Sequence, residues 1–220
     1  MILNVQGRVL YDIILYAVPT QREGEDHFYL ECDTNVSADI VKFLKRYKIR
    51  KKVIITDLEG EFRTWASLSS PQQIQNSLSE KETRKITLCE QDPRVPSFGS
   101  RLILPHDTSF LSGNERDYHL KRYQLGIGEG IEDLPPGNCY PLECNLHFKH
   151  GVSFQKGCYI GQELTARTHH RGVVRKRLMP IFFESIPEGL NSGEIITDTE
   201  DKTFSVLIAN AYFLPFLPDL

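Results

Sequence analysis

Short apolar runs, each followed by a polar or proline-containing stretch, limit what this chain of 220 residues can fold into. None of them approaches the roughly 18 apolar residues of a membrane-spanning helix, so we expect no membrane insertion. The run from Val9 to Val18 is rich in Ile, Leu, Val and Tyr, and Phe28 to Cys32 repeats this composition after a polar segment. Two such runs joined by a polar segment predict a β-hairpin.

A helical pattern follows the predicted hairpin. The apolar residues between Val36 and Tyr47 recur at helical spacing, and either Asp33 or Thr34 is a suitable N-cap. Lys48 to Lys52 then places positive charge at the end of the helix, where the helix dipole favours it.

Further strand-like and helix-like segments alternate along the chain. We expect strands at 53–55 and 62–68, a short helix that begins near Pro71, a helix over 115–125 and a turn at 135–137. After Pro180, the residues at 181–184 and 195–196 predict strands of a second module. The sequence therefore predicts an α+β protein with one region over 1–177 and a β module over 178–220.

Residues 156–163, Lys-Gly-Cys-Tyr-Ile-Gly-Gln-Glu, carry the strongest functional signal of the sequence. They place Cys158 between two glycines, just ahead of a helix-compatible segment. A thiol must lose its proton to act as a nucleophile or as a soft-metal ligand, and Lys156, Arg167 or a helix N-terminus would favour the thiolate. The alternative is burial, because a lone cysteine usually packs as a small hydrophobic residue.

The other residues of this stretch allow a functional and a structural interpretation. Gly157 and Gly161 lack Cβ atoms, so they permit unusual backbone angles and let a partner or cofactor approach closely. Gln162 and Glu163 stand where a helix begins, and an acidic residue in a first turn is also an ordinary structural choice.

The octapeptide matches, residue for residue, the signature Lys-x-Cys-x-x-Gly-Gln-Glu of the YgfZ-like branch of the folate-binding aminomethyltransferase (GcvT) superfamily. Residues 3–12, 133–137 and 151–154 also resemble the mitochondrial members of this branch, which are iron–sulfur cluster assembly factors. The resemblance extends over residues 1 to about 185, and the octapeptide is its most specific part.

This resemblance implies a fold, a function and a partner. The fold is the GcvT-like folate-binding fold, completed by a small C-terminal β-barrel, and the function is a late step in making [4Fe-4S] proteins in the mitochondrial matrix. Cys158 is then the thiolate ligand of a [2Fe-2S] cluster shared with an A-type iron–sulfur carrier protein, with the rest of the signature in support. One cysteine cannot enclose a cluster, so other ligands must come from the partner, from a small thiol or from elsewhere in this chain.

Glu143 is the second site that the resemblance implies. It lies within 141–146, where the superfamily carries the carboxylate that recognises the pterin of tetrahydrofolate, and a carboxylate can accept two parallel hydrogen bonds from adjacent N–H groups. An exposed or capping glutamate is the alternative. A folate-dependent aminomethyltransferase is the alternative function, with Asp33 as the nearest candidate for its carboxylate, although no catalytic motif compels that function.

The five cysteines are odd in number and include no Cys-x-x-Cys pair, which favours a reducing compartment over a disulfide framework. Cys139 and Cys144 offer a weak metal-binding alternative, because their spacing is uncommon and Pro141 intervenes. Cys32 and Cys89 follow hydrophobic residues, so we expect both in the core.

A net charge of -3 excludes a generally basic nucleic-acid binder, but residues 167–177 form a local basic patch. We expect a turn or strand at His169–His170, since adjacent histidines cannot share one helix face. A solvated face, or a docking surface for an acidic protein, is favoured over RNA binding.

Both ends of the chain depart from the pattern of the resembled family. Met1–Leu3 opens in strand-like residues with no transit peptide, where the family carries a targeting segment and the first part of the folate-binding domain. Residues 204–220 become an apolar tail where the family continues its β-barrel. We therefore expect a chain that is incomplete at its N-terminus and truncated at its C-terminus.

Overall fold

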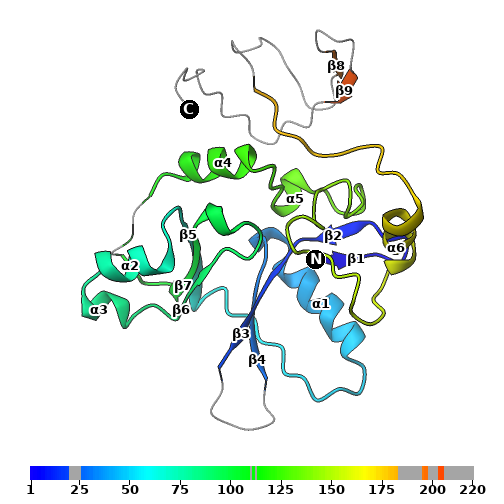
Figure 1. The fold of residues 1–220 in the computed structure, drawn as a ribbon. Coiled ribbons are helices and arrows are strands. Elements are labelled where there is room, and N and C mark those ends of the chain that lie inside the picture. The colour runs from blue at the N-terminus through cyan, green and yellow to red at the C-terminus, as the bar shows by residue number, and fades with distance from the viewer. Residues whose placement is uncertain (20–25, 110, 112, 183–194, 198–202, 206–220) are drawn as a thin grey trace.

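The computed structural model describes residues 1–19, 26–109, 111, 113–182, 195–197 and 203–205, and within these its strands form four small antiparallel sheets (Figure 1). Three sheets are two-stranded and pair β1 with β2, β3 with β4, and β8 with β9. The fourth has the order β5-β7-β6. Helices and strands thus both occur, as the sequence predicts, whereas the GcvT-like fold stays a prediction.

The predicted hairpin is confirmed. Strands β3 (Ile14–Val18) and β4 (His27–Glu31) pair with Ile14 opposite Glu31 and Val18 opposite His27. The predicted strand over 9–18 is nevertheless divided, because β2 (Val9–Tyr11) pairs with β1 (Ile2–Leu3) instead. The break falls at Asp12, whose Oδ1 accepts a hydrogen bond from the Gly130 N–H at 3.1 Å, so a residue distant in the sequence holds the chain where it changes sheet.

The predicted first helix is also confirmed, as α1 (Ser37–Lys48). A 3₁₀ turn, η1 (Thr34–Val36), precedes it, and the Asp33 side chain caps that turn by accepting a hydrogen bond from the Asn35 N–H. Buried Ile40 packs α1 against Ile2 and Val36, so the helix covers the β1–β2 pair.

The three-stranded sheet has its own core. Its strands are β5 (Phe62–Ser67), β6 (Leu88–Gln91) and β7 (Ser100–Pro105). Central strand β7 is buried from Ser100 to Leu104, and its Leu102 and Leu104 pack with Ile74 of α2 (Pro71–Ser77). The short helix expected near Pro71 is therefore confirmed, and Ser70 and Gln73 form its capping box.

Two of the remaining helices lie between strands of this sheet, and the other three follow it in the chain. They are α3 (Glu80–Thr83), η2 (Pro96–Phe98), α4 (Glu115–Gln124), α5 (Gly130–Asp133) and α6 (Gln162–Arg171). The expected helix over 115–125 and the expected turn at 135–137 are both present. Leu3 and Val9 pack against Leu134, Cys144 and Leu146, and Figure 1 shows α6 beside β1 and β2.

A buried ion network joins the hairpin to the three-stranded sheet and to α4. Arg94 contacts both oxygens of Asp92 and also contacts Glu129, while Arg101 contacts Glu129 at 2.8 Å and Glu31 at 3.3 Å. The Tyr118 hydroxyl donates to Glu129, and that of Tyr16 donates to Glu31. This network was not predicted from the sequence, because charged residues are mostly exposed and carry no local sign of burial.

The strand predicted at 53–55 is wrong. The described chain has no strand there, and the Ile54 side chain is 92% exposed. Apolar and β-branched composition favours a strand only where a neighbouring edge offers hydrogen bonds, and β5 pairs with β7 instead.

The expectations for the C-terminal module are tested only in part. Residues 195–196 lie in β8 (Ile195–Thr197), which pairs with β9 (Thr203–Ser205), so that strand is confirmed. Residues 181 and 182 lie outside any strand, whereas 183–184 and most of the predicted apolar tail fall outside the described residues. In the described part of the chain, every helix is too short or too polar to span a membrane.

Candidate functional site

Cys158 lies in an irregular loop over 151–161, immediately before α6, and its side chain is exposed. The chain's other four cysteines are half-buried or buried, so Cys158 is the exposed thiol of the described structure. Burial, the alternative that an average cysteine favours, therefore does not apply. A thiol in this position is accessible to another molecule without any opening of the core.

The loop is anchored to the start of the chain through two glycines. The turn from Asn4 to Arg8 is closed by backbone hydrogen bonds, and Gly7 within it lies against Gly161. Gly161 has φ 75°, and a Cβ added to it would lie 2.7 Å from the Gly7 Cα atom, which excludes a larger residue. The structure thus brings together two segments that the resemblance singled out separately.

The two glycines of the signature differ in their surroundings. The group that approaches Gly161 belongs to this chain and not to a partner or cofactor. Gly157, in contrast, has no described atom beyond its own chain neighbours within 4 Å of the position that a Cβ would take. Close approach by a second molecule is therefore possible at Gly157, next to the thiol.

The two predicted cations contact groups other than the sulfur. The Lys156 ammonium lies 4.9 Å from the centre of the Tyr159 ring, and the Arg167 guanidinium pairs with Glu163 at 2.6 Å. The sulfur instead has the amide of Gln162 beside it, at 3.5 Å from Nε2 to Sγ. Gln162 and Glu163 do open α6, as expected, and Glu163 forms an exposed pair one turn along the helix.

An aromatic stack fixes the far side of the loop. The Phe154 ring lies 3.7 Å from the ring of His169 and nearly parallel to it, and His170 meets Phe154 edge-on. Both histidines belong to the last turn of α6, so the turn or strand expected for them is wrong. Helical propensity and the cap at Gly161 determine this segment, and the two rings leave the helix in different directions.

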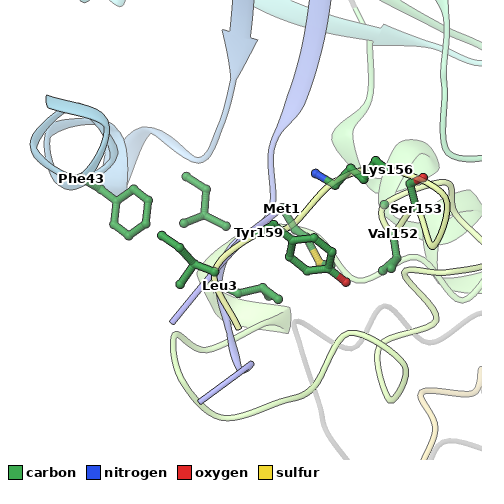
Figure 2. A pocket seen from close by; sticks show the side chains of 10 residues that line it. Met1, Leu3, Phe43, Val152, Ser153, Lys156 and Tyr159 are labelled. Atoms are coloured by element: carbon green, nitrogen blue, oxygen red, sulfur yellow. The ribbon is translucent and has the colours of Figure 1, made fainter. Parts of the chain in front are cut away.

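A small cavity of about 180 Å³ lies beside the loop, between its Tyr159 and Lys156, the first strand and Phe43 of α1 (Figure 2). The Tyr159 hydroxyl is buried and has no hydrogen-bond partner among the described residues. Small-molecule sites usually enclose roughly 300 Å³ or more, so this cavity is smaller than a folate site. Glu143 is not among its lining residues.

The Glu143 side chain caps the turn in which it lies. Its Oε2 accepts a hydrogen bond from the Tyr140 N–H at 3.1 Å, and its backbone carbonyl accepts one from the Leu178 N–H. These contacts are those of a capping glutamate, the alternative to pterin recognition. Asp33 is engaged in a similar way, because its two carboxylate oxygens accept hydrogen bonds from the N–H groups of Asn35 and Ile131.

The remaining cysteines pack in the core. Cys32 and Cys89 lie at the edges of two apolar clusters, as expected, and burial raises the pKa of the Cys32 thiol to about 11. A hydrogen bond with Cys139, followed by burial, raises the pKa of the Cys144 thiol. Nowhere in the described chain do three or more His, Cys, Asp or Glu side chains form a metal-holding group.

The basic patch is only partly free for binding. Arg177 donates to Asn145 Oδ1 at 3.0 Å and lies over the Phe148 ring, so it holds the segment that follows α6. Arg171, Arg175 and Lys176 are exposed. These three cations lie in the same part of the chain as α6 and leave a positively charged surface for an acidic molecule.

Comparison with known proteins finds relatives of a single kind among those most similar to the chain. A Mus musculus protein named iron–sulfur cluster assembly factor IBA57, mitochondrial, is 49% identical over 205 residues, which cover 90% of this chain and 57% of the relative. The Homo sapiens protein of that name is 44% identical over 209 residues, or 91% of this chain and 58% of the relative. A homologue from Mycosarcoma maydis is 39% identical over 82% of this chain and 45% of its own length.

The chain therefore spans little more than half the length of the first two relatives. No family model matches it.

Proposed function

Since the chain is a homologue of the mitochondrial iron–sulfur cluster assembly factors named IBA57, we propose that it acts in iron–sulfur cluster assembly in mitochondria. The family resemblance carried by the octapeptide is confirmed by these relatives. The finer proposal is a late step, the maturation of [4Fe-4S] proteins in the matrix, in which the cluster is the cargo.

The observation that carries the proposal is the exposed thiol of Cys158, on a loop anchored at both ends by packing within the chain. Thiolates are the usual ligands of iron–sulfur clusters. The described residues near Cys158 offer no second thiol, because the other four cysteines pack elsewhere. The remaining ligands of a cluster at Cys158 must therefore come from a second molecule.

We assign the role of this second molecule to an A-type iron–sulfur carrier protein that brings a [2Fe-2S] cluster. In a shared site, the Cys158 thiolate binds iron after its proton passes to solvent, and the carrier's cysteines supply the other sulfurs. Gly157, with open space in front of it, allows the carrier to approach the backbone beside the thiol. Arg171, Arg175 and Lys176 offer positive charge to an acidic surface of the carrier.

The described contacts of Glu143 and the cavity beside the loop do not by themselves form a tetrahydrofolate site. Glu143 is engaged by the Tyr140 N–H, and the cavity beside the loop is smaller than a folate site and lacks Glu143. We therefore derive no step through folate. Neither does any described contact of Asp33 favour an aminomethyl transfer reaction.

The proposal is tested by anaerobic mixing of the wild-type chain, or of Cys158→Ala, with a [2Fe-2S]-loaded A-type carrier. Visible absorption and the size of the complex are followed together. We expect a coloured heterocomplex from the wild type and about a ten-fold or greater loss of it from Cys158→Ala, because the variant lacks the exposed sulfur of the chain. Cys89→Ala, which removes a half-buried thiol at the three-stranded sheet, is the matched control and should keep the complex. Equal complexes from Cys158→Ala and the wild type would remove Cys158 from the role of ligand.

A further inference from the structure

A single turn brings the thiols of Cys139 and Cys144 together. The Tyr140 carbonyl accepts hydrogen bonds from the N–H groups of Glu143 and Cys144, at 3.0 and 3.2 Å, so the chain turns back on itself between the two cysteines. The Glu143 side chain closes the same turn through the Tyr140 N–H at 3.1 Å. The two thiols are hydrogen-bonded to each other. The backbone of the turn therefore holds the two sulfurs side by side.

The two thiols differ in how easily another molecule can reach them. Cys144 is only 4% exposed and belongs to the apolar cluster around Leu134, whereas Cys139 packs at the edge of that cluster and is half-buried. The hydrogen bond from Cys144 also lowers the pKa of the Cys139 thiol, because it stabilises a thiolate there. A small molecule thus meets Cys139 first and finds a second thiol already in contact with it. Redox-active cysteine pairs have this arrangement of an accessible thiol and a neighbour that completes the disulfide.

The segment that carries this pair also holds the start of the chain. The Val9 N–H donates to the Cys139 carbonyl at 2.9 Å, and the Gly137 N–H donates to the Val9 carbonyl at 2.7 Å. Two residues before Val9, Gly7 lies against Gly161 and so anchors the loop before α6. A change in the stiffness of the Cys139 segment is therefore passed, through Val9, to the anchor of that loop.

We propose that Cys139 and Cys144 form a redox-active pair, which a small-molecule disulfide of the glutathione type oxidises to an intramolecular disulfide. The Cys139 thiolate attacks one sulfur of the small disulfide, and the other sulfur leaves as a thiolate. The Cys144 thiol then loses its proton to solvent, and its sulfur attacks the Cys139 sulfur and expels the second thiolate. The protein thiols are oxidised by two electrons, and the small disulfide is reduced to two thiols.

The new bond closes the turn covalently, so it restricts the segment that pairs with Val9. Oxidation of this pair should therefore stiffen the start of the chain and the anchor of the loop before α6. This inference goes beyond the proposed function and does not depend on it, because neither sulfur is assigned to a cluster.

The test incubates the wild-type chain, anaerobically and without metal, with mixtures of reduced and oxidised glutathione that run from fully reducing to fully oxidising. N-ethylmaleimide in denaturant then blocks the remaining thiols, and trypsin releases residues 123–149 as one peptide that contains both cysteines. Mass spectrometry of this peptide should show the loss of two hydrogen atoms and no bound glutathione. Cys158 is the internal control, because it is exposed and has the Gln162 amide beside its sulfur, so it should end as a mixed disulfide with glutathione.

Two variants separate the roles of the two thiols. Cys144→Ser removes the second sulfur, so Cys139 should remain as a mixed disulfide with glutathione. Cys139→Ser removes the accessible sulfur, and the buried Cys144 should then react about ten-fold more slowly than Cys139 does in the wild type. Circular dichroism checks that each variant is folded.

Hydrogen exchange of the backbone amides at 3–10 measures the effect of the disulfide on the start of the chain. We expect exchange in the oxidised wild type to be about three-fold or more slower than in the reduced wild type. The Cys144→Ser variant, treated in the same way, is the control and should show no such slowing.

Three results would overturn the redox pair. They are a reduced peptide 123–149 in mixtures that already modify Cys158, wild-type Cys139 that keeps glutathione while Cys144 stays reduced, or a disulfide from either residue to another cysteine. Equal exchange at 3–10 in the oxidised and reduced wild type would refute the link to the loop before α6. A wild-type chain that forms this disulfide but no coloured complex with the carrier would count against the proposed function alone.

Discussion

At the scale of single residues, the two glycines that flank Cys158 meet different neighbours. Gly161 has a positive φ and lies against backbone atoms of Gly7, whereas Gly157 faces open space. Close contact between two backbones leaves no flexible side chain that could move aside for a Cβ atom. The stability of the loop and its accessibility therefore depend on different glycines.

We expect Gly161→Ala to lower the free energy of unfolding by about 2 kcal/mol or more, through strain at φ 75° and the clash with Gly7. Gly157→Ala is the matched control and should change it by less than about 0.5 kcal/mol. Urea denaturation followed by circular dichroism measures both. Equal stability of the two variants would show that the Gly7 contact does not hold the loop.

Gly157 allows the approach of the partner to be tested at a single residue. If a second molecule approaches the backbone there, Gly157→Ala should keep the fold and weaken the coloured complex with the carrier.

At the scale of elements, α6 and the loop before it act as one unit. The N-terminal end of α6 contacts the loop through Gln162, and its C-terminal end contacts the loop through the Phe154–His169 stack. Because the loop has no regular secondary structure, these side-chain contacts and the Gly7–Gly161 contact limit its motion.

We predict that Phe154→Ala speeds hydrogen exchange of the backbone amides at 151–160 by about ten-fold, equivalent to about 1.4 kcal/mol of lost local stability. Phe148→Ala is the control, because Phe148 is 63% exposed and contacts His147 and Arg177 outside this loop. Exchange rates at 151–160 that match the wild type in Phe154→Ala would contradict a holding role for the stack.

The segment after α6 carries the exposed part of the basic patch. Reversing two of its charges, in Arg175→Glu with Lys176→Glu, should slow association with the carrier about ten-fold at low salt and much less at 0.5 M salt. The same reversal at exposed Lys51 and Lys52, after α1, is the control. Stopped-flow mixing measures the rates, and an equal loss from both double variants would argue against a specific docking surface.

At the scale of the whole molecule, the ion network around Glu129 connects elements that are distant in the sequence. Burial alone raises the pKa of Glu129, but Arg101 and Arg94 more than offset this and lower it to about 2. A carboxylate with a lowered pKa stabilises the fold above its unfolded pKa, near 4.5. This contribution is lost as the pH falls from about 4.5 toward 2.

Glu129→Gln should therefore lower the free energy of unfolding at pH 7 by about 3 kcal/mol, since it leaves two buried guanidinium groups with less compensation. The difference from wild type should shrink as the pH falls through the same window. Glu163→Gln, at an exposed pair, is the control and should differ from wild type by less than about 1 kcal/mol. Urea denaturation between pH 2 and pH 7 tests this, and a constant difference at every pH would contradict the linkage.

The sequence by itself determined the local features of this protein. Helix α1, the capped helix at Pro71, the hairpin and the helix that begins at Gln162 follow from spacing, capping residues and residue type, which act over a few neighbouring positions. The octapeptide by its residues alone also indicated a presented thiol at Cys158 and the resemblance to the assembly factors.

Only the tertiary structure decided the contacts between distant segments. It placed Gly7 against Gly161, buried the network around Glu129, and left 53–55 without a strand partner. It also set Lys156 over the Tyr159 ring and paired Arg167 with Glu163. These outcomes depend on which surfaces meet when the chain packs, and residues far apart in sequence leave no local pattern of that meeting. The side-chain contact of Gln162 with the Cys158 sulfur depends on both sequence and tertiary structure. Gln162 belongs to the octapeptide, but the direction of its amide follows from the folded loop.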